Sequence, residues 1–190
     1  HCMDLAAQLT ERYDLQICEI APSDFDAPEL MTGVAIVGAA EMLKHLESKT
    51  RKVIAVGTGL LPHACVEQLP HMECPQHHMV SIVGHMRPDG SATTYSVVGR
   101  LANRVGSQHN PMPLPVIVRN SSELPILHKQ EPVARTLELC AGADVTFVGI
   151  AHIDGTSPLL RDGFISIEER RALTEMGAVG EIVGWVFDEN

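Results

Sequence analysis

The sequence predicts an α/β domain, a Rossmann-like parallel sheet with helices on both faces. Short apolar runs rich in β-branched residues alternate along the chain with longer segments that carry apolar residues at helical spacing. Residues 144–150 form one such run, bounded by glycines. Periodicity alone does not separate a buried strand from a buried helical piece, but the short length and β-branched content favour a strand covered on both faces. Ligands of such sheets bind beyond the carboxyl ends of the strands, so the polar loop that follows, with His152 and Asp154, is a candidate site.

Composition limits the possible classes of protein. The chain has 190 residues, of which 45% are hydrophobic, enough for one domain with a sizeable core. Its 14 basic and 24 acidic residues give a formal charge of -10, which disfavours binding to nucleic acid by this chain alone. No apolar stretch has the roughly 18–20 residues of a membrane span, and no signal peptide is visible, so a cytoplasmic location is expected. The five scattered cysteines fit buried thiols better than a disulfide framework.

The N-terminal quarter is expected to contain two helices and one strand. The expected elements are a helix at 2–13, a strand at 15–20, a loop at 21–27 and a helix from Pro28 to about Glu47. The inward-facing positions of the second helix, or their neighbours, are Leu30, Val34, Val37, Ala40 and Leu43. The chain starts with His1 and Cys2, so a preceding segment is expected.

A glycine-rich turn follows the next predicted strand. Residues 52–56 are expected to form the strand, Gly57-Thr58-Gly59 the turn, and the following helix begins near Pro62 and buries Val66 and Leu69. Backbone N–H groups at such a turn can approach an anion. Glycines also serve tight turns that bind nothing, so both interpretations remain open.

Residues 71–78, HMECPQHH, form an unusual cluster of three histidines and one cysteine. These side chains could bind zinc or nickel. Their spacing matches no standard zinc motif, and Pro75 suggests a solvated surface loop, which is the preferred interpretation.

The remaining elements follow the same alternation. They are a strand at 80–83 that ends in Gly84 and His85, a turn at Asp89-Gly90, a helix at about 92–105, a loop at 106–113, a strand at 114–118, short helical pieces around Pro125 and Pro132, and a last strand at 179–187 interrupted by Gly184. The helix at 92–105 is expected to bury Val97, Leu101 and Val105. Ser166 and Glu169 have the spacing of a capping box, and Gly177 is placed to end that helix.

Four stretches carry a resemblance to a known family: VIAVGTGLLPHACVEQLP, VSIVGH, GADVTFVGIAHIDGTSPLLRDGFISIEERRAL and GAVGEIVGWVFD. Together they resemble the C-terminal effector-binding, or sugar-binding, domain of SorC-type bacterial transcriptional regulators. The third and fourth stretches, in that order and closely spaced, are the specific part.

The resemblance implies a fold similar to that of glucosamine-phosphate deaminases and ribose-phosphate isomerases, but no turnover. It implies that residues 1–190 are an effector domain that is incomplete at its C-terminal end. A helix-turn-helix domain, absent from this chain, would precede it and supply all contact with DNA. The effector would be a sugar or sugar phosphate, and the assembly a homo-oligomer, dimeric or tetrameric. No cofactor, metal or membrane partner is implied.

Matching the motifs residue by residue gives the candidate ligand-binding set. It comprises Gly57, Thr58, Gly59 and Leu60 in the first loop, Gly84 and His85 in the second, Gly149, Ala151 and Asp154 after the strand at 144–150, and Ala178, Val179, Gly180 and Glu181 in the last motif. No catalytic residue is implied.

One departure from the family pattern bears on the ligand. Leu60 and Leu61 stand where many members carry hydroxyl residues, and no lysine or arginine lies near them in sequence. This favours a neutral sugar, a polyol or a weak anion over a tightly clamped phosphate. Independently of the resemblance, carboxylates at strand ends, such as Asp154 and Glu181, can accept hydrogen bonds from sugar hydroxyls. Alternatively, Asp154 could be solvated and Glu181 could cap a turn, with neither binding a ligand.

Two other functions remain open. A sugar-phosphate isomerase or deaminase would use a carboxylate base, for which Asp154 or Glu181 is available, although no adjacent acid/base pair is evident. An oligomerisation module that binds no ligand is the third possibility.

Overall fold

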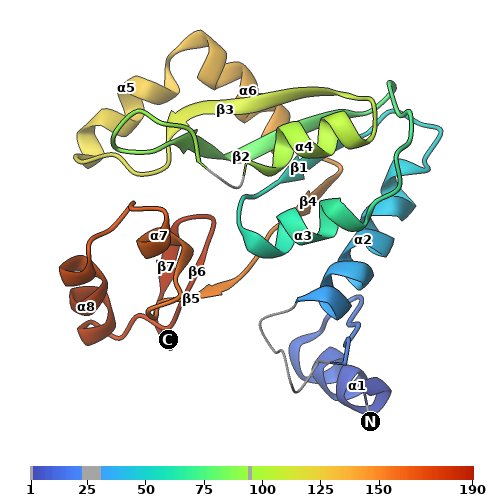
Figure 1. Cartoon of the computed structure of the whole chain (residues 1–190), viewed down its shortest axis with the longest axis horizontal. Coiled ribbons are helices and arrows are strands. Elements are labelled where there is room, and N and C mark those ends of the chain that lie inside the picture. Colours follow the sequence, from blue (N-terminus) through green and yellow to red (C-terminus); the bar gives the residue numbers. More distant parts are fainter. Residues whose placement is uncertain (1, 23–30, 94–95) are drawn as a thin grey trace.

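The computed structural model describes residues 2–22, 31–93 and 96–190 (Figure 1). Its strands are β1 (Val53–Val56), β2 (His78–Met86), β3 (Gln108–Pro115), β4 (Val145–Phe147), β5 (Ala151–His152), β6 (Gly180–Ile182) and β7 (Trp185–Phe187). Its helices are α1 (Cys2–Tyr13), α2 (Thr32–Leu46), α3 (Leu60–Gln68), α4 (Val97–Arg104), η1 (Ser121–Glu123), α5 (Leu124–His128), α6 (Glu131–Ala141), α7 (Pro158–Arg161) and α8 (Ile167–Glu175). Within these residues, no helix is both long enough and apolar enough to cross a membrane.

A four-stranded sheet in the order β3-β2-β1-β4 forms the centre of the fold, and all of its pairs are parallel. The predicted parallel sheet is therefore confirmed. β1 is the apolar run VIAV, and its last three residues are buried because the strand has a neighbour on each side and helices above and below. Since β1 and β4 are adjacent and parallel, the loops that follow them leave the same edge of the sheet.

Helices cover both faces of this sheet, as predicted. On one face, α2, α3 and α4 pack against Ile54, Val56 and Met79 in the larger core cluster. On the other face, α6 packs on β2 and β3 around Met112, Leu114 and Val133. The expected core positions of α3 and α4 are confirmed: Val66, Leu69, Val97, Leu101 and Val105 are all buried.

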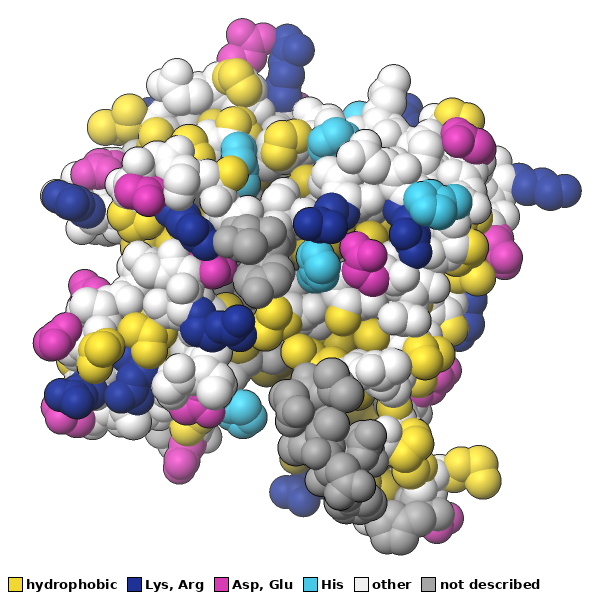
Figure 2. All heavy atoms as spheres, viewed as in Figure 1, with side chains coloured by type: hydrophobic (Ala, Val, Ile, Leu, Met, Phe, Trp, Pro, Cys, Tyr) yellow, Lys and Arg dark blue, Asp and Glu magenta, His cyan; other side chains and the backbone are white. Residues whose placement is uncertain are grey.

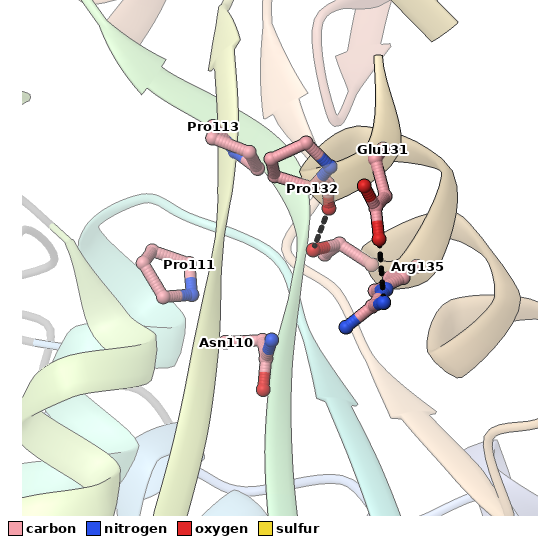
Figure 3. A pocket seen from close by; sticks show the side chains of 7 residues that line it. Asn110, Pro111, Pro113, Glu131, Pro132 and Arg135 are labelled. Carbon is pink, nitrogen blue, oxygen red and sulfur yellow. Dashed lines mark hydrogen bonds and ion pairs between the residues drawn. The ribbon is translucent and has the colours of Figure 1, made fainter. Parts of the chain in front are cut away.

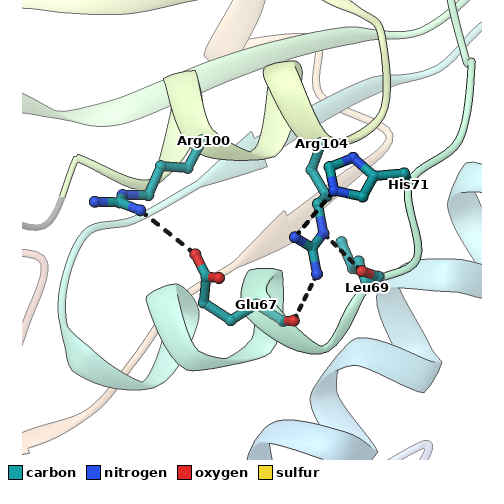
Figure 4. Close-up of polar contacts among 5 residues, drawn as sticks. All are labelled: Glu67, Leu69, His71, Arg100 and Arg104. Atoms are coloured by element: carbon teal, nitrogen blue, oxygen red, sulfur yellow. Dashed lines mark hydrogen bonds and ion pairs between the residues drawn. The ribbon is translucent and has the colours of Figure 1, made fainter.

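The end of α3 is held by an arginine from the neighbouring helix. Arg104 of α4 donates from Nε to the Leu69 carbonyl oxygen (2.7 Å) and from Nη2 to the Glu67 carbonyl oxygen (2.8 Å), as Figure 4 shows. These carbonyls lack helical partners at a C-terminus, and a cation there also favours the helix dipole. The contact sets the position of α3, whose opposite end lies at the candidate site.

A second, three-stranded antiparallel sheet in the order β5-β6-β7 lies beside the first (Figure 1). The single last strand expected at 179–187 is wrong: a turn at Val183-Gly184 folds it into the β6–β7 hairpin, with positive φ at both residues. The capping box of α8 is confirmed, since Ser166 Oγ accepts from Glu169 N and Glu169 Oε2 accepts from Ser166 N. The chain leaves α8 through Gly177, which has a φ of 95°.

Two expectations for the N-terminal region are corrected. Residues 15–20 form no strand, because they have no pairing partner, and Leu15 and Ile17 are exposed. The buried stripe of α2 is Ala35, Ala39, Met42 and Leu46, whereas Val34 and Ala40 are exposed. Small alanines allow α2 to approach α3 closely, which residue hydrophobicity alone does not indicate. The expected start at Pro28 and the inward position of Leu30 lie outside the described residues.

Two strand boundaries are also corrected. The expected loop at 106–113 is largely β3, which begins at Gln108 and ends before the predicted 118. Its prolines, at 111, 113 and 115, are tolerated because β3 is an edge strand, where a missing N–H costs no ladder bond on the open side. The run at 144–150 forms only β4, at the other edge. Thr146 is exposed, so this strand is not covered on both faces.

The segment at 71–78 is not a solvated loop throughout. His77 is buried, with Nε2 2.9 Å from the Leu46 carbonyl oxygen, and its Nδ1 accepts from Lys52 N (3.2 Å). Cys74 is also buried, and its Sγ contacts the same Leu46 carbonyl oxygen. These side chains join the end of α2 to the start of β1. Across the described ranges, no group of three or more potential ligands could hold a metal ion.

Candidate functional site

A cavity of about 180 Å³ opens where the loops after β1 and β4 meet the small sheet. Six of the sequence-predicted residues line it: Thr58, Gly59, Leu60, Gly149, Ala151 and Glu181. Its other lining residues are Met31, Leu61, Pro62, Ile150, His152, Thr156 and Pro158. The parallel pairing of β1 with β4 joins the first two loops, and the pairing of Ala151 with Glu181 brings in the third element.

One wall of the cavity is the N-terminus of α3. Gly59 is the N-cap, with φ 121° and ψ 177°, a backbone conformation that favours glycine. No side chain caps this helix start. The N–H groups of Leu60 and Leu61 belong to the first turn, where an α-helix offers no carbonyl partner, and Pro62 has no N–H. This wall therefore presents hydrogen-bond donors and the positive end of the helix dipole.

Glu181 on β6 contributes a hydrogen-bond acceptor to the cavity, whereas the start of α3 contributes donors. Its side chain is only 8% exposed, and Oε2 accepts a hydrogen bond from Gly184 N at 2.9 Å. Burial raises the pKa of this carboxyl, and the Gly184 hydrogen bond opposes the rise only in part. No described residue donates a hydrogen bond to Oε1. A ligand hydroxyl in the cavity can donate to Oε1.

Glycines allow the two loops to pack closely beside the cavity. Gly57 N donates to the Phe147 carbonyl oxygen (2.8 Å), which extends the β1–β4 ladder by one residue. A side chain at Gly149 would place its Cβ 3.1 Å from Pro62 Cδ. The loop after β4 therefore lies directly on the first turn of α3.

The other predicted residues lie outside the lining. Gly57, Ala178, Val179 and Gly180 flank it: Val179 N donates to the Phe187 carbonyl oxygen, and Gly180 pairs with His152. Gly84 instead lines a separate apolar hollow with Trp185, and His85 Nδ1 donates to the Met112 carbonyl oxygen (2.7 Å).

Asp154 has a local role in this structure. Its Oδ1 accepts from Thr156 Oγ1 and Thr156 N, which together lower the pKa of the carboxyl. The side chain is exposed and shapes the turn that brings Thr156 and Pro158 to the cavity. The sequence-based candidate set lacks these two residues, and it also lacks Met31, Leu61, Pro62 and Ile150. The Asp-Gly-Thr-Ser turn signal could have indicated Thr156. Nothing local indicates Met31, which comes from the start of α2.

A larger hollow of about 340 Å³ lies elsewhere, between the edge of β3 and α6 (Figure 3). It is lined mainly by prolines and by side chains that bond within α6: Arg135 pairs with Glu131, and Thr136 Oγ1 donates to the Pro132 carbonyl oxygen. These groups are satisfied locally. Size alone therefore does not make it the better candidate.

Comparison with known sequences identifies the family. The sequence profile of the family described as "Putative sugar-binding domain" matches residues 1–190. The chain belongs to this sugar-binding domain family.

Curated relatives of this sugar-binding domain are regulatory proteins. The chain is 27% identical to the erythritol catabolism regulatory protein EryD of Brucella abortus, over 100% of the chain and 60% of that protein. It is 29% identical to the transcriptional regulator LsrR of Klebsiella pneumoniae, over 97% of the chain and 55% of that protein. The chain thus spans little more than half the length of these relatives.

Solved structures agree in fold. The full-length sorbitol operon regulator SorC of Klebsiella pneumoniae matches with a TM-score of 0.75 at 22% identity, covering 98% of this chain and 61% of that one. A DeoR family transcriptional regulator of Listeria monocytogenes matches with a TM-score of 0.82 at 19% identity, covering 98% and 73%. The resemblance to SorC-type regulators is confirmed.

Proposed function

We propose that this chain is the effector-sensing domain of a transcriptional regulator, which binds a sugar, polyol or sugar phosphate in the cavity between α3 and Glu181. The observation that carries the proposal is the meeting of an uncapped helix N-terminus and a buried carboxylate in one cavity of a sugar-binding domain. Hydroxyl groups both donate and accept hydrogen bonds, so a carbohydrate can satisfy both walls at once.

DNA contact belongs to a helix-turn-helix domain outside this chain, and the regulatory signal is a change in homo-oligomeric assembly. Two oligomeric arrangements of the regulator are then in equilibrium, and the effector shifts that equilibrium only by the difference between its affinities for the two arrangements. The names of the relatives support a regulatory role, because EryD and SorC are named for control of erythritol catabolism and the sorbitol operon.

The cavity binds its ligand without turnover. Among the described residues that line it, Glu181 is the only carboxylate and His152 the only other titratable side chain. Asp154, the other carboxylate suggested by the sequence, bonds to Thr156 and lies outside the lining. An isomerase or deaminase would need a base and an acid placed around the reacting carbon.

A thermal-shift panel of sugars, polyols and their phosphates tests the proposal. At least one compound should raise the melting temperature, and Leu60→Trp, which fills the cavity, should abolish that rise. Ile17→Trp, at an exposed position away from the cavity, should leave it unchanged. A folded protein that responds to no compound at millimolar concentration would refute the proposal.

A further inference from the structure

Among the described residues, no positive side chain lines the cavity. Its described lining contains neither lysine nor arginine, and Glu181 is its only fully charged group. The sequence at positions 1, 23–30 and 94–95 also contains neither residue. A phosphate ester bound here would therefore meet backbone N–H groups, two threonines and one histidine, with a carboxylate in the same small space. Sites that recognise phosphate normally supply an arginine or lysine as well.

Hydrogen bonding to Glu181 also favours an uncharged ligand over a phosphate ester. Its Oε2 accepts from Gly184 N, which leaves Oε1 to accept from a ligand, and an ionised phosphate group has no hydrogen to donate. A hydroxyl group can donate to Oε1, and its neighbour can accept from the N–H groups of Leu60 and Leu61. A chain of adjacent hydroxyls therefore matches the two walls better than an anion does.

The size of the cavity limits the length of the ligand. A cavity of about 150 Å³ accommodates benzene, with about six non-hydrogen atoms. By that scale the 180 Å³ found here encloses about seven such atoms, and a ligand of up to about ten fits only if its end reaches the opening. A four-carbon polyol has about eight and a five-carbon polyol about ten, whereas a hexose phosphate has about sixteen.

From charge, hydrogen bonding and size together, we infer that the effector is a short, uncharged polyol of four or five carbons, held by donation of its hydroxyl groups to Glu181. This inference rests on the proposed function and names the ligand class for the same cavity. Leu60, Ile150 and Pro158 then cover the C–H edges of the polyol.

Titration calorimetry on the protein compares ligands of different charge and length. Erythritol and ribitol should bind at least tenfold more tightly than erythrose 4-phosphate, and inorganic phosphate should not bind measurably. Sorbitol, which is longer, should bind more weakly than erythritol. If a phosphate ester or a six-carbon polyol binds most tightly, this inference is wrong while the proposed function stands. If none of these compounds binds but another compound of the thermal-shift panel does, only this inference fails; if no compound of the panel binds, the proposed function fails as well.

Two substitutions test the role assigned to Glu181. Glu181→Gln keeps the shape and an oxygen for Gly184 N, but it should weaken polyol binding about tenfold or more because a charged acceptor is lost. Glu175→Gln, on the exposed end of α8, should change nothing. Leu60→Arg places a cation at the α3 N-terminus and should improve binding of erythrose 4-phosphate relative to erythritol. Unchanged polyol affinity in folded Glu181→Gln would overturn the inference.

Discussion

Glu181 is the buried ionisable side chain of the cavity, and its ionisation has a predictable effect on the free energy of unfolding. Burial raises its folded pKa above the ordinary value of 4.5, so the folded chain holds this proton more tightly than the unfolded chain does. Its contribution to stability is therefore complete below 4.5 and is lost as pH rises toward the raised folded pKa.

The variant Glu181→Gln should abolish that part of the pH dependence. The free energy of unfolding, measured by urea titration from pH 4 to 8, should fall with pH less steeply in the variant than in the wild type. Asp154→Asn is a control of opposite sign, because the folded pKa of Asp154 is lowered and its contribution is lost as pH falls. Of the other titratable groups on the elements around Glu181, β5 carries His152, α3 carries His63, Cys65 and Glu67, and β7 carries none. A pH profile unchanged by Glu181→Gln would contradict the assignment.

Val183 is a second residue with a measurable effect. Its φ of 57° is rare for a β-branched side chain, and Gly184 follows with 82°. Asparagine followed by glycine is the preferred pair for a hairpin turn with positive φ at both central residues. Val183→Asn should raise the free energy of unfolding by about 1 kcal/mol. Gly184→Ala should lower it, since alanine adopts this φ poorly. A destabilised Val183→Asn would show that the contact of Val183 beside Gly57 outweighs the strain.

At the scale of whole elements, the site depends on how α3 is held at its far end. Arg104 donates to two carbonyl oxygens there, whereas Arg100 makes only an exposed ion pair with Glu67 at 3.5 Å (Figure 4). Arg104→Met should cost about 1–2 kcal/mol of unfolding free energy. Arg100→Met, the matched control, should cost less than about 0.5 kcal/mol. Equal losses in chemical denaturation would contradict this role for Arg104.

Elements with strong local signals were predictable, and those that depend on a partner were not. The capping box of α8 and the turn before α3 each depend on residues that are close together in the sequence, so local sequence sufficed to predict them. Residues 15–20 resemble a strand but find no neighbour, and β3 forms despite its prolines because it lies at an edge. Strand pairing joins distant segments, and no local pattern records whether a neighbour is available.

At the scale of the whole molecule, ligand binding and core packing should be separable. Figure 2 shows acidic and basic side chains interspersed on one face. Leu101 of α4 belongs to the larger core cluster and does not line the cavity. Leu101 is 1% exposed in that cluster, so Leu101→Ala should cost about 3 kcal/mol. Effector affinity, measured by calorimetry at a temperature where the variant is folded, should not change.

A saturating effector should offset most of that loss. At a hundredfold excess over its Kd, a ligand of the folded state adds about 2.7 kcal/mol of stability. The melting temperature of Leu101→Ala should rise correspondingly when the effector is added. An affinity that falls more than about threefold in the folded variant would show that the core and the cavity are coupled.

The sequence by itself determined the α/β class, the glycine turn, the caps, the core faces of α3 and α4, and the family, because each depends on neighbouring residues or on a continuous motif. Only the tertiary structure decided which candidates share a cavity. Thr58, Gly149 and Glu181 meet because β1 pairs with β4 and β5 pairs with β6, whereas Asp154 bonds to its own turn and His85 to β3. Pairing between distant strands determines which side chains face one another, and that depends on the energy of the whole packed chain rather than on any single stretch.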